Sequence, residues 1–199
     1  MKKRLVFLTI LSLTVFFLVT TKNVNSQKDE TVIETLKSNE PLKIISFDVR
    51  GKKVLSGEKF PDSDDWTKTL SVNVQNSFGK KVSYIGIGIF FTRPKDQETV
   101  PIFHYSLIRG NKKSALKRLE SGFDFASSNS PDKNTKIILS DKEYHEIRES
   151  LDQLGYPAKI AKIQVQIEEI VFEDGRLWSL GSWYKIDPDD PNKLFPLSL

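Results

Sequence analysis

Apolar and polar side chains alternate along several segments of the chain, which is the pattern of half-buried β-strands. The first such segment begins at Leu42, where Ile45, Phe47 and Val49 share one face, and it stops at Gly51. The pattern predicts strands at residues 42–50, 70–75, 82–91, 101–108 and 136–139, followed by a C-terminal hairpin within 163–186.

The clearest alternation lies in segment 82–91. One face carries bulky side chains, Ile85, Ile87, Ile89 and Phe91, and the other carries Tyr84, Gly86, Gly88 and Phe90. We expect the bulky face to pack into a core. The glycine face is expected either to meet water or to let another group approach closely.

One helix is predicted after Ser140, because Ser140 and Glu143 have the spacing of a capping box. An apolar stripe follows at helical spacing and consists of Tyr144, Ile147, Leu151 and Leu154, and Gly155 ends it. Helical character is also expected at 112–120, and a loop at 121–134.

The C-terminal hairpin shows a change of parity. Ile163, Val165 and Ile167 share a face, but Ile170 and Phe172 lie on the opposite parity, so the pair Glu168 and Glu169 predicts a β-bulge. As neighbours in a strand, these two glutamates are expected to point to opposite faces, which excludes them as paired glycosidase acids. Asp174–Gly175 predicts a tight two-residue turn, and residues 177–186 are expected to return as one strand.

These elements predict a mainly β fold, namely a two-sheet antiparallel sandwich with immunoglobulin-like topology and one helix inserted before the C-terminal hairpin. A small β-barrel is the alternative. A single domain is expected over residues 42–199, preceded by a flexible lead-in at 27–41 with a short helical turn at Thr31–Leu36.

The first 26 residues have the order of a secretory signal peptide. Lys2, Lys3 and Arg4 precede an apolar run over residues 5–19, and Val24–Asn25–Ser26 offers small residues for cleavage. The run is shorter than the ~20 residues that span a bilayer as a helix. We therefore expect cleavage near Ser26 and a mature protein without a transmembrane segment, with an uncleaved anchor as the alternative.

Removal of this segment changes the charge of the protein. The chain has a formal net charge of +4, but four of its 30 basic residues and none of its 26 acidic residues lie in the segment. The neutral mature chain gives no reason to expect nucleic acid as a partner. The chain has no cysteine, so disulfides and a lipid on an N-terminal cysteine are excluded. The expected location is extracytoplasmic, either periplasmic or secreted, in a bacterial setting.

Candidate catalytic chemistry is sparse. The chain has no Gly-x-Ser-x-Gly motif, and its two histidines, His104 and His145, lie on different predicted elements. Two separated histidines also argue against a zinc site. The sequence therefore predicts no catalytic residue and no cofactor.

Two groups of residues are weak candidates for ligand binding. Calcium could be held by the oxygens of Asp187, Asp189, Asp190 and Asn192, although Asp and Pro are ordinary turn residues. A platform for sugar rings could be formed by Trp178, Trp183 and Tyr184, although most aromatic residues in a sandwich belong to its core.

Several C-terminal motifs carry a family resemblance, and the most specific is the Phe-x-Asp-Gly-x-x-Trp hairpin from Phe172 to Trp178 with the Asp-Pro tail at 187–193. On these residues, and on Leu154–Gly155–Tyr156–Pro157, the chain resembles a group of uncharacterised exported bacterial proteins. The resemblance covers roughly residues 42–195. It implies a signal peptide followed by one β-rich domain and supplies no activity, cofactor or site residue.

Three functions follow as hypotheses. The first is an exported, non-enzymatic β-sandwich that binds an unknown partner or has a structural role in the cell envelope. The second is a carbohydrate-binding module that uses exposed aromatic residues. An enzyme of unrecognised type is the least favoured, because no nucleophile or acid–base set converges.

Overall fold

The computed structural model describes residues 30–36, 39–61, 65–94, 97–110, 134–190 and 192–198. The expected signal peptide lies outside the described residues. So do the helical segment expected at 112–120 and nearly all of the loop expected at 121–134.

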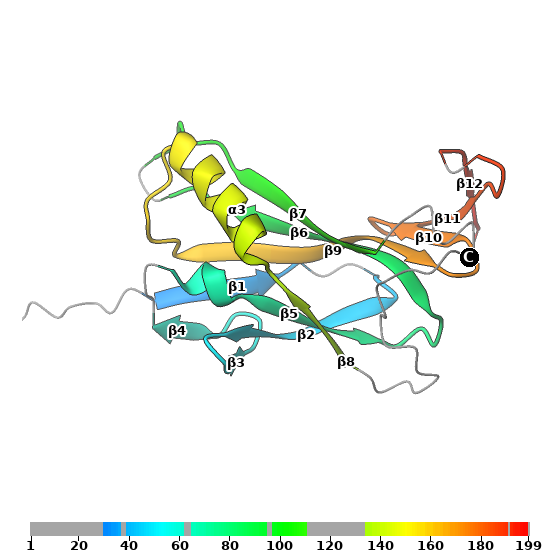
Figure 1. Cartoon of the computed structure of the whole chain (residues 1–199), viewed down its shortest axis with the longest axis horizontal. Helices are drawn as coiled ribbons and strands as arrows, with labels where there is room; N and C mark the ends of the chain where they lie inside the picture. The colour runs from blue at the N-terminus through cyan, green and yellow to red at the C-terminus, as the bar shows by residue number, and fades with distance from the viewer. Residues whose placement is uncertain are drawn as a thin grey trace, which may run out of the picture.

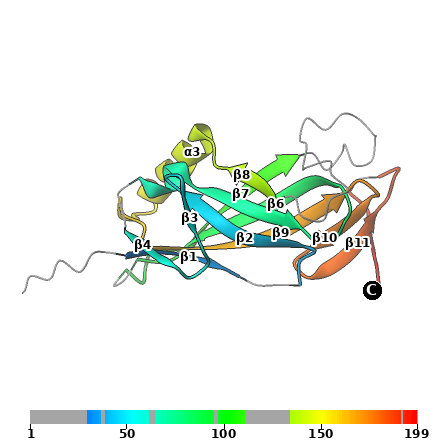
Figure 2. The same ribbon diagram turned by 90° about the horizontal axis from the view of Figure 1, so that it is seen from below.

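The described strands form two sheets that pack against each other (Figures 1 and 2). The larger sheet contains β1 (Glu30–Thr35), β4 (Lys59–Pro61), β6 (Val82–Phe91), β7 (Phe103–Gly110), β9 (Lys162–Phe172), β10 (Arg176–Ser179), β11 (Ser182–Ile186) and β12 (Leu194–Pro196). The smaller sheet has the order β3 (Lys52–Val54), β2 (Leu42–Val49), β5 (Ser71–Asn76) and β8 (Asn134–Ile138). The mainly β, two-sheet sandwich is thereby confirmed, whereas the immunoglobulin-like topology stays a prediction.

Strand β9 is the centre of the larger sheet. It pairs antiparallel with β6 along almost its whole length. On its other edge, the beginning of β9 pairs with β1 and the end pairs with β10. The sheet then continues from β6 to β7, from β1 to β4, and from β10 through β11 to β12.

Strand β1 corrects the prediction of a flexible lead-in with a helical turn at Thr31–Leu36. Residues 30–35 form a strand that runs parallel to β9, so the domain already includes residue 30 and the sheet is not wholly antiparallel. Thr31 and Ile33 are fully buried. The β-branched run of Thr31, Val32 and Ile33 favours a strand, but the surrounding charged residues hide this signal in the sequence.

The core lies between the two sheets. The bulky face of β6 is buried there as predicted, because Ile85, Ile87 and Ile89 have no exposed surface. In β2, a shift of register between Ile44 and Ser46 changes the expected alternation. Ser46 is buried, whereas Ile45, which was expected on the buried face, is only half-buried.

Helix α3 (Asp141–Gln153) confirms the predicted helix. The Ser140 side chain accepts a hydrogen bond from the Glu143 backbone N–H, and the Glu143 carboxylate accepts one from the Ser140 N–H, which is the capping box. Tyr144, Ile147 and Leu151 are buried in the core, and Gly155 follows the helix with a φ of +80°. Figure 1 shows α3 beside β6 and β7.

A short 3₁₀ helix, η1 (Trp66–Thr69), packs near α3. Among the described residues, neither helix has the length and hydropathy needed to cross a membrane.

Two turns differ from the predicted hairpin. The β9–β10 connection has three residues, Glu173 to Gly175, closed by a hydrogen bond from the Gly175 N–H to the Phe172 carbonyl. The two-residue turn occurs instead at Leu180–Gly181, where both residues have positive φ (44° and 92°) and Ser179 pairs with Ser182. Residues 177–186 are therefore two strands. Leucine rarely adopts positive φ, so this turn could not be recognised from its residues.

The three-residue turn makes a prediction about Gly175, whose φ is +81°. Gly175→Val should lower the free energy of unfolding by about 1 kcal/mol or more, because a β-branched residue is strained at positive φ. Gly175→Asn should lose less, because asparagine tolerates this conformation. Urea unfolding of both variants measures the difference, and a valine variant as stable as the parent protein would contradict the turn.

Candidate functional site on the outer face of the larger sheet

The predicted bulge in β9 is present, and it places two glutamates on the same face of the sheet. Ile167 pairs with Ile87 and Glu169 pairs with Gly86, so Glu168 is the extra residue. A Cβ atom built on Gly88 would lie 2.6 Å from Oε1 of Glu168, and one built on Gly86 would lie 3.8 Å from Cβ of Glu169.

The expectation that Glu168 and Glu169 point to opposite faces is therefore wrong, because a bulge interrupts the regular alternation of a strand. Both glutamates lie on the glycine face of β6, away from the core. Of the two expectations for that face, the close approach of another group is the one that the structure shows. The approaching groups belong to the chain itself: Glu168 and Phe90 both lie within 3 Å of a Cβ built on Gly88.

Two residues of β7 join Glu168 on this outer face. His104 lies opposite Phe90, and Ser106 lies opposite Gly88. The His104 Nε2 atom is 2.9 Å from Oε1 of Glu168, and the Ser106 hydroxyl donates a hydrogen bond of 3.2 Å to Oε2 of the same carboxylate. The His104 ring also stacks on the Phe90 ring, with 4.5 Å between their centroids. We call His104, Ser106 and Glu168 the outer-face cluster.

The outer-face cluster contains a serine, a histidine and a carboxylate, but not in the arrangement that activates a nucleophile. In a Ser-His-acid relay, one ring nitrogen faces the hydroxyl and the other faces the carboxylate. Here the same atom, Nε2 of His104, faces both Glu168, at 2.9 Å, and the Ser106 oxygen, at 3.4 Å. The Ser106 proton also points to Glu168 instead of the imidazole. This geometry joins the three polar groups to one another through the Glu168 carboxylate and leaves the Ser106 hydroxyl without an activating base.

Tyr84 extends this polar surface at the other end of the bulge. Burial raises the pKa of the Tyr84 hydroxyl to about 12, and the nearby carboxylates of Glu169 and Glu168 add to this rise. Glu169 is also a hydrogen-bond partner of the hydroxyl. The two carboxylates of the bulge thus both act on the Tyr84 hydroxyl.

His145, the second histidine, does not join the outer-face cluster. It lies on the exposed side of α3, and its ring meets the Tyr144 ring edge-on at 5.4 Å. The two histidines thus have separate surroundings, as their positions in the sequence predict.

The three residues proposed as a sugar platform do not share an exposed face. Trp178 is fully buried, and Trp183 lies directly opposite it and packs against Phe172. Tyr184 lies on the other side of the sheet, in a small cluster with Leu177. The Leu180–Gly181 turn explains this arrangement. It pairs Trp178 with Trp183 on the core side of the sheet and leaves Tyr184 on the other side, opposite Leu177. The platform prediction is wrong for these residues.

The candidate calcium ligands instead close the loop in which they lie. The Asp187 carboxylate accepts a hydrogen bond from the Asp189 N–H and pairs with Lys193, while Asp190 accepts one from the Asn192 N–H. The Asp189 N–H, opposed by a smaller effect of burial and helped by Lys193, lowers the pKa of Asp187. Within the described ranges, no three His, Asp or Glu side chains gather around a point suited to a metal ion. Turn formation accounts for all the contacts seen in this loop.

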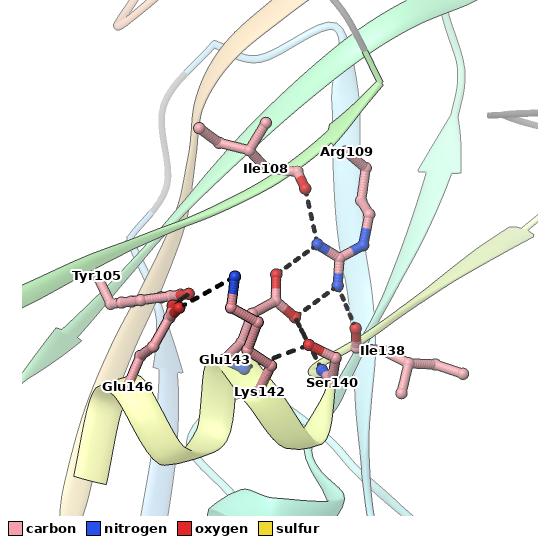
Figure 3. Close-up of polar contacts among 8 residues, drawn as sticks. All are labelled: Tyr105, Ile108, Arg109, Ile138, Ser140, Lys142, Glu143 and Glu146. Carbon is pink, nitrogen blue, oxygen red and sulfur yellow. Dashed lines mark hydrogen bonds and ion pairs between the residues drawn. The ribbon is translucent and has the colours of Figure 1, made fainter. Parts of the chain in front are cut away.

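A further polar group, which the sequence analysis missed, joins the larger sheet to α3 (Figure 3). The Arg109 guanidinium donates two hydrogen bonds to the Glu143 carboxylate, of 2.7 and 2.9 Å, and another to the Ile138 carbonyl at the end of β8. Nearby, the Tyr105 hydroxyl donates a hydrogen bond to Glu146. The signal in the sequence was an arginine two positions after Leu107, and therefore on the same face of β7 as this buried residue.

The Arg109–Glu143 pair affects the acidity of the helix cap. Burial alone would raise the pKa of Glu143, but Arg109 and the N–H and hydroxyl of Ser140 outweigh it and lower the pKa to about 2. The side chains of both partners are mostly shielded from water. The pair therefore joins two layers of the fold by charge-assisted hydrogen bonds.

This lowered pKa predicts a dependence of stability on pH. Because the folded-state pKa (about 2) lies below the ordinary value of 4.5, the Glu143 carboxylate stabilises the fold fully above about pH 4.5, and this contribution is lost as the pH falls toward 2. Glu143→Gln should lower the free energy of unfolding by on the order of 2 kcal/mol at pH 7, and by progressively less below pH 4.5. Urea unfolding between pH 7 and pH 2.5 measures this, with Glu149→Gln, on the exposed side of the same helix, as the control. A loss that is independent of pH would contradict the assignment.

The comparisons with known proteins supply no relative. The chain matches no model of a protein family, and no similar protein is found among curated proteins or among solved structures.

Proposed function

We propose that the chain is an exported, non-enzymatic β-sandwich protein that binds another protein through the outer face of its larger sheet. The observation that carries this proposal is the bulge in β9, which turns Glu168 and Glu169 outward over Gly86 and Gly88. Bulges of this kind are frequent at sites where a side chain must be aimed away from the regular strand direction.

The arrangement is one that stability alone does not favour. A glycine inside a strand costs about 0.5–1 kcal/mol relative to alanine, and β6 contains two on its outer face. Neighbouring carboxylates on the same face also repel each other. Packing of the core accounts for the bulge itself, but not for a glutamate at both outward positions, because the core lies on the opposite face of β6. A binding role would account for that choice of residues.

The outer-face cluster also supports a role in binding over a role in catalysis. His104 faces both polar partners through a single nitrogen, and Ser106 gives its proton to Glu168. A serine held in this way is not primed for attack by the base beside it. The proposal of export rests on the charge, apolar run and small residues of the first 26 residues.

Two exposed isoleucines on edge strands allow a matched test of the binding face. Ile108 lies on the outer face opposite Gly86 and is 48% exposed, whereas Ile138 lies on the smaller sheet and is 58% exposed. A photo-reactive amino acid at position 108, in the organism that encodes the chain, should give a protein adduct of defined mass. The same amino acid at position 138 should not.

Glu168→Lys should remove the adduct at position 108, because it reverses the charge at the centre of the proposed face. Equal adducts at both positions, or none at position 108, would reject the binding face. N-terminal sequencing of the exported chain, which we expect to begin at Gln27, tests the proposal of export separately.

A further inference from the structure

The atoms of the outer-face cluster have the mutual distances of ligands around one metal ion. The Nε2 atom of His104 is 2.9 Å from Oε1 of Glu168 and 3.4 Å from Oγ of Ser106, and Oγ of Ser106 is 3.2 Å from Oε2 of Glu168. Two donors that each lie about 2.0–2.2 Å from a zinc ion, at angles of about 90–109°, are separated by about 2.8–3.6 Å. The distances from Nε2 of His104 to Oε1 of Glu168 and to Oγ of Ser106 fall within this range, as does the distance from Oγ of Ser106 to the second carboxylate oxygen, Oε2.

We propose that His104, Glu168 and Ser106 form an open site for a divalent transition-metal ion of the Zn²⁺ and Cu²⁺ class. Imidazole nitrogen and carboxylate oxygen are the donors that such ions accept, and the serine hydroxyl is a weaker third donor. The remaining positions around the ion are open to water or to a group from a partner. His104, which the sequence separates from His145, instead has a carboxylate from β9 as its neighbour.

The donor atoms are held in place by three separate features of the fold. The bulge in β9 aims Glu168 across the sheet, and the missing side chain of Gly88 leaves room for its carboxylate. The Phe90 ring holds the His104 imidazole by stacking. Such support around the direct ligands is typical of metal sites.

The charge around the outer-face cluster also suits a cation. The Nε2 atom of His104 and the oxygen of Glu168 can be neighbours only when a proton or a cation lies between them. The bulge places a second carboxylate, that of Glu169, on the same face as Glu168. Side chains of His104 and Glu168 are 41% and 21% exposed, so an ion can reach them from water.

Titration of the purified chain with ZnCl₂, followed by calorimetry, tests the inference directly. We expect saturable binding of one ion per chain, weakened at least about tenfold by His104→Ala and by Glu168→Gln. His145→Ala, which changes the other of the two histidines in the chain, should leave binding unchanged. An excess of Ca²⁺ should not compete, because calcium prefers sites made of oxygen ligands alone.

A pair of glycine variants tests the geometry of the site. Gly88→Ala places a methyl group where the Glu168 carboxylate lies and should weaken zinc binding. Gly86→Ala should not, because the atom nearest to its new methyl group, the Tyr84 hydroxyl oxygen, is 3.5 Å away. With Cu²⁺, electron paramagnetic resonance should show coupling to one imidazole nitrogen, and His104→Ala should remove it.

The inference is overturned if the parent chain shows no saturable zinc binding, or if His104→Ala binds as the parent does. Because His104 is a surface residue, this variant decides the question even if Gly88→Ala fails to fold, and circular dichroism of each variant shows whether it is folded. The inference rests on the outer face being the functional surface that we propose above. The titration needs no partner, however, so its failure would leave the photo-crosslinking experiment to decide the proposed function.

Discussion

The larger sheet depends on the hydrogen bonding of β9, which is shared among three strands. This strand must keep an apolar face toward the core while it pairs with β6 on one edge and with β1 and then β10 on the other. A regular strand with this sequence would turn Ile170 and Phe172 away from the core. The bulge at Glu168 restores their direction, and both are fully buried. The same bulge that turns the two glutamates outward therefore keeps the buried face of β9 continuous.

Local patterns in the sequence were sufficient to predict most of the strands, the helix and the bulge. The capping residues of α3 and the alternation in β6 act through neighbours in the chain, so they can be recognised without the rest of the fold. Strand β1 was missed because charged residues surround its β-branched run and because one of its two partners, β9, lies far away in the sequence. The turn at Leu180–Gly181 was missed because pairing between the flanking strands, rather than the preference of leucine, imposes positive φ.

In the candidate site, too, local features could be recognised from the sequence, whereas contacts between distant segments could not. The sequence identified His104, the glycines of β6 and the glutamate pair, but it could not bring them together. Ser106 and Glu168 are 62 positions apart, and Arg109 and Glu143 are 34 apart. These contacts exist because sheet pairing and the placement of α3 set the register of distant segments. Side-chain periodicity reports which face a residue occupies, but not which residue of another strand lies beside it.

The pairing of β1 with β9 has a consequence for the order in which the chain can fold. The side chains of Glu34 and Gln164, which touch across this pair, are separated by 130 positions. The parallel pairing cannot form until β9 has been synthesised, and closing so long a loop is slow. One edge of β1 must therefore stay unpaired while most of the chain is made, although the other edge can pair with β4 much earlier. Such a delay exposes a β-branched edge that has to be protected until its partner arrives.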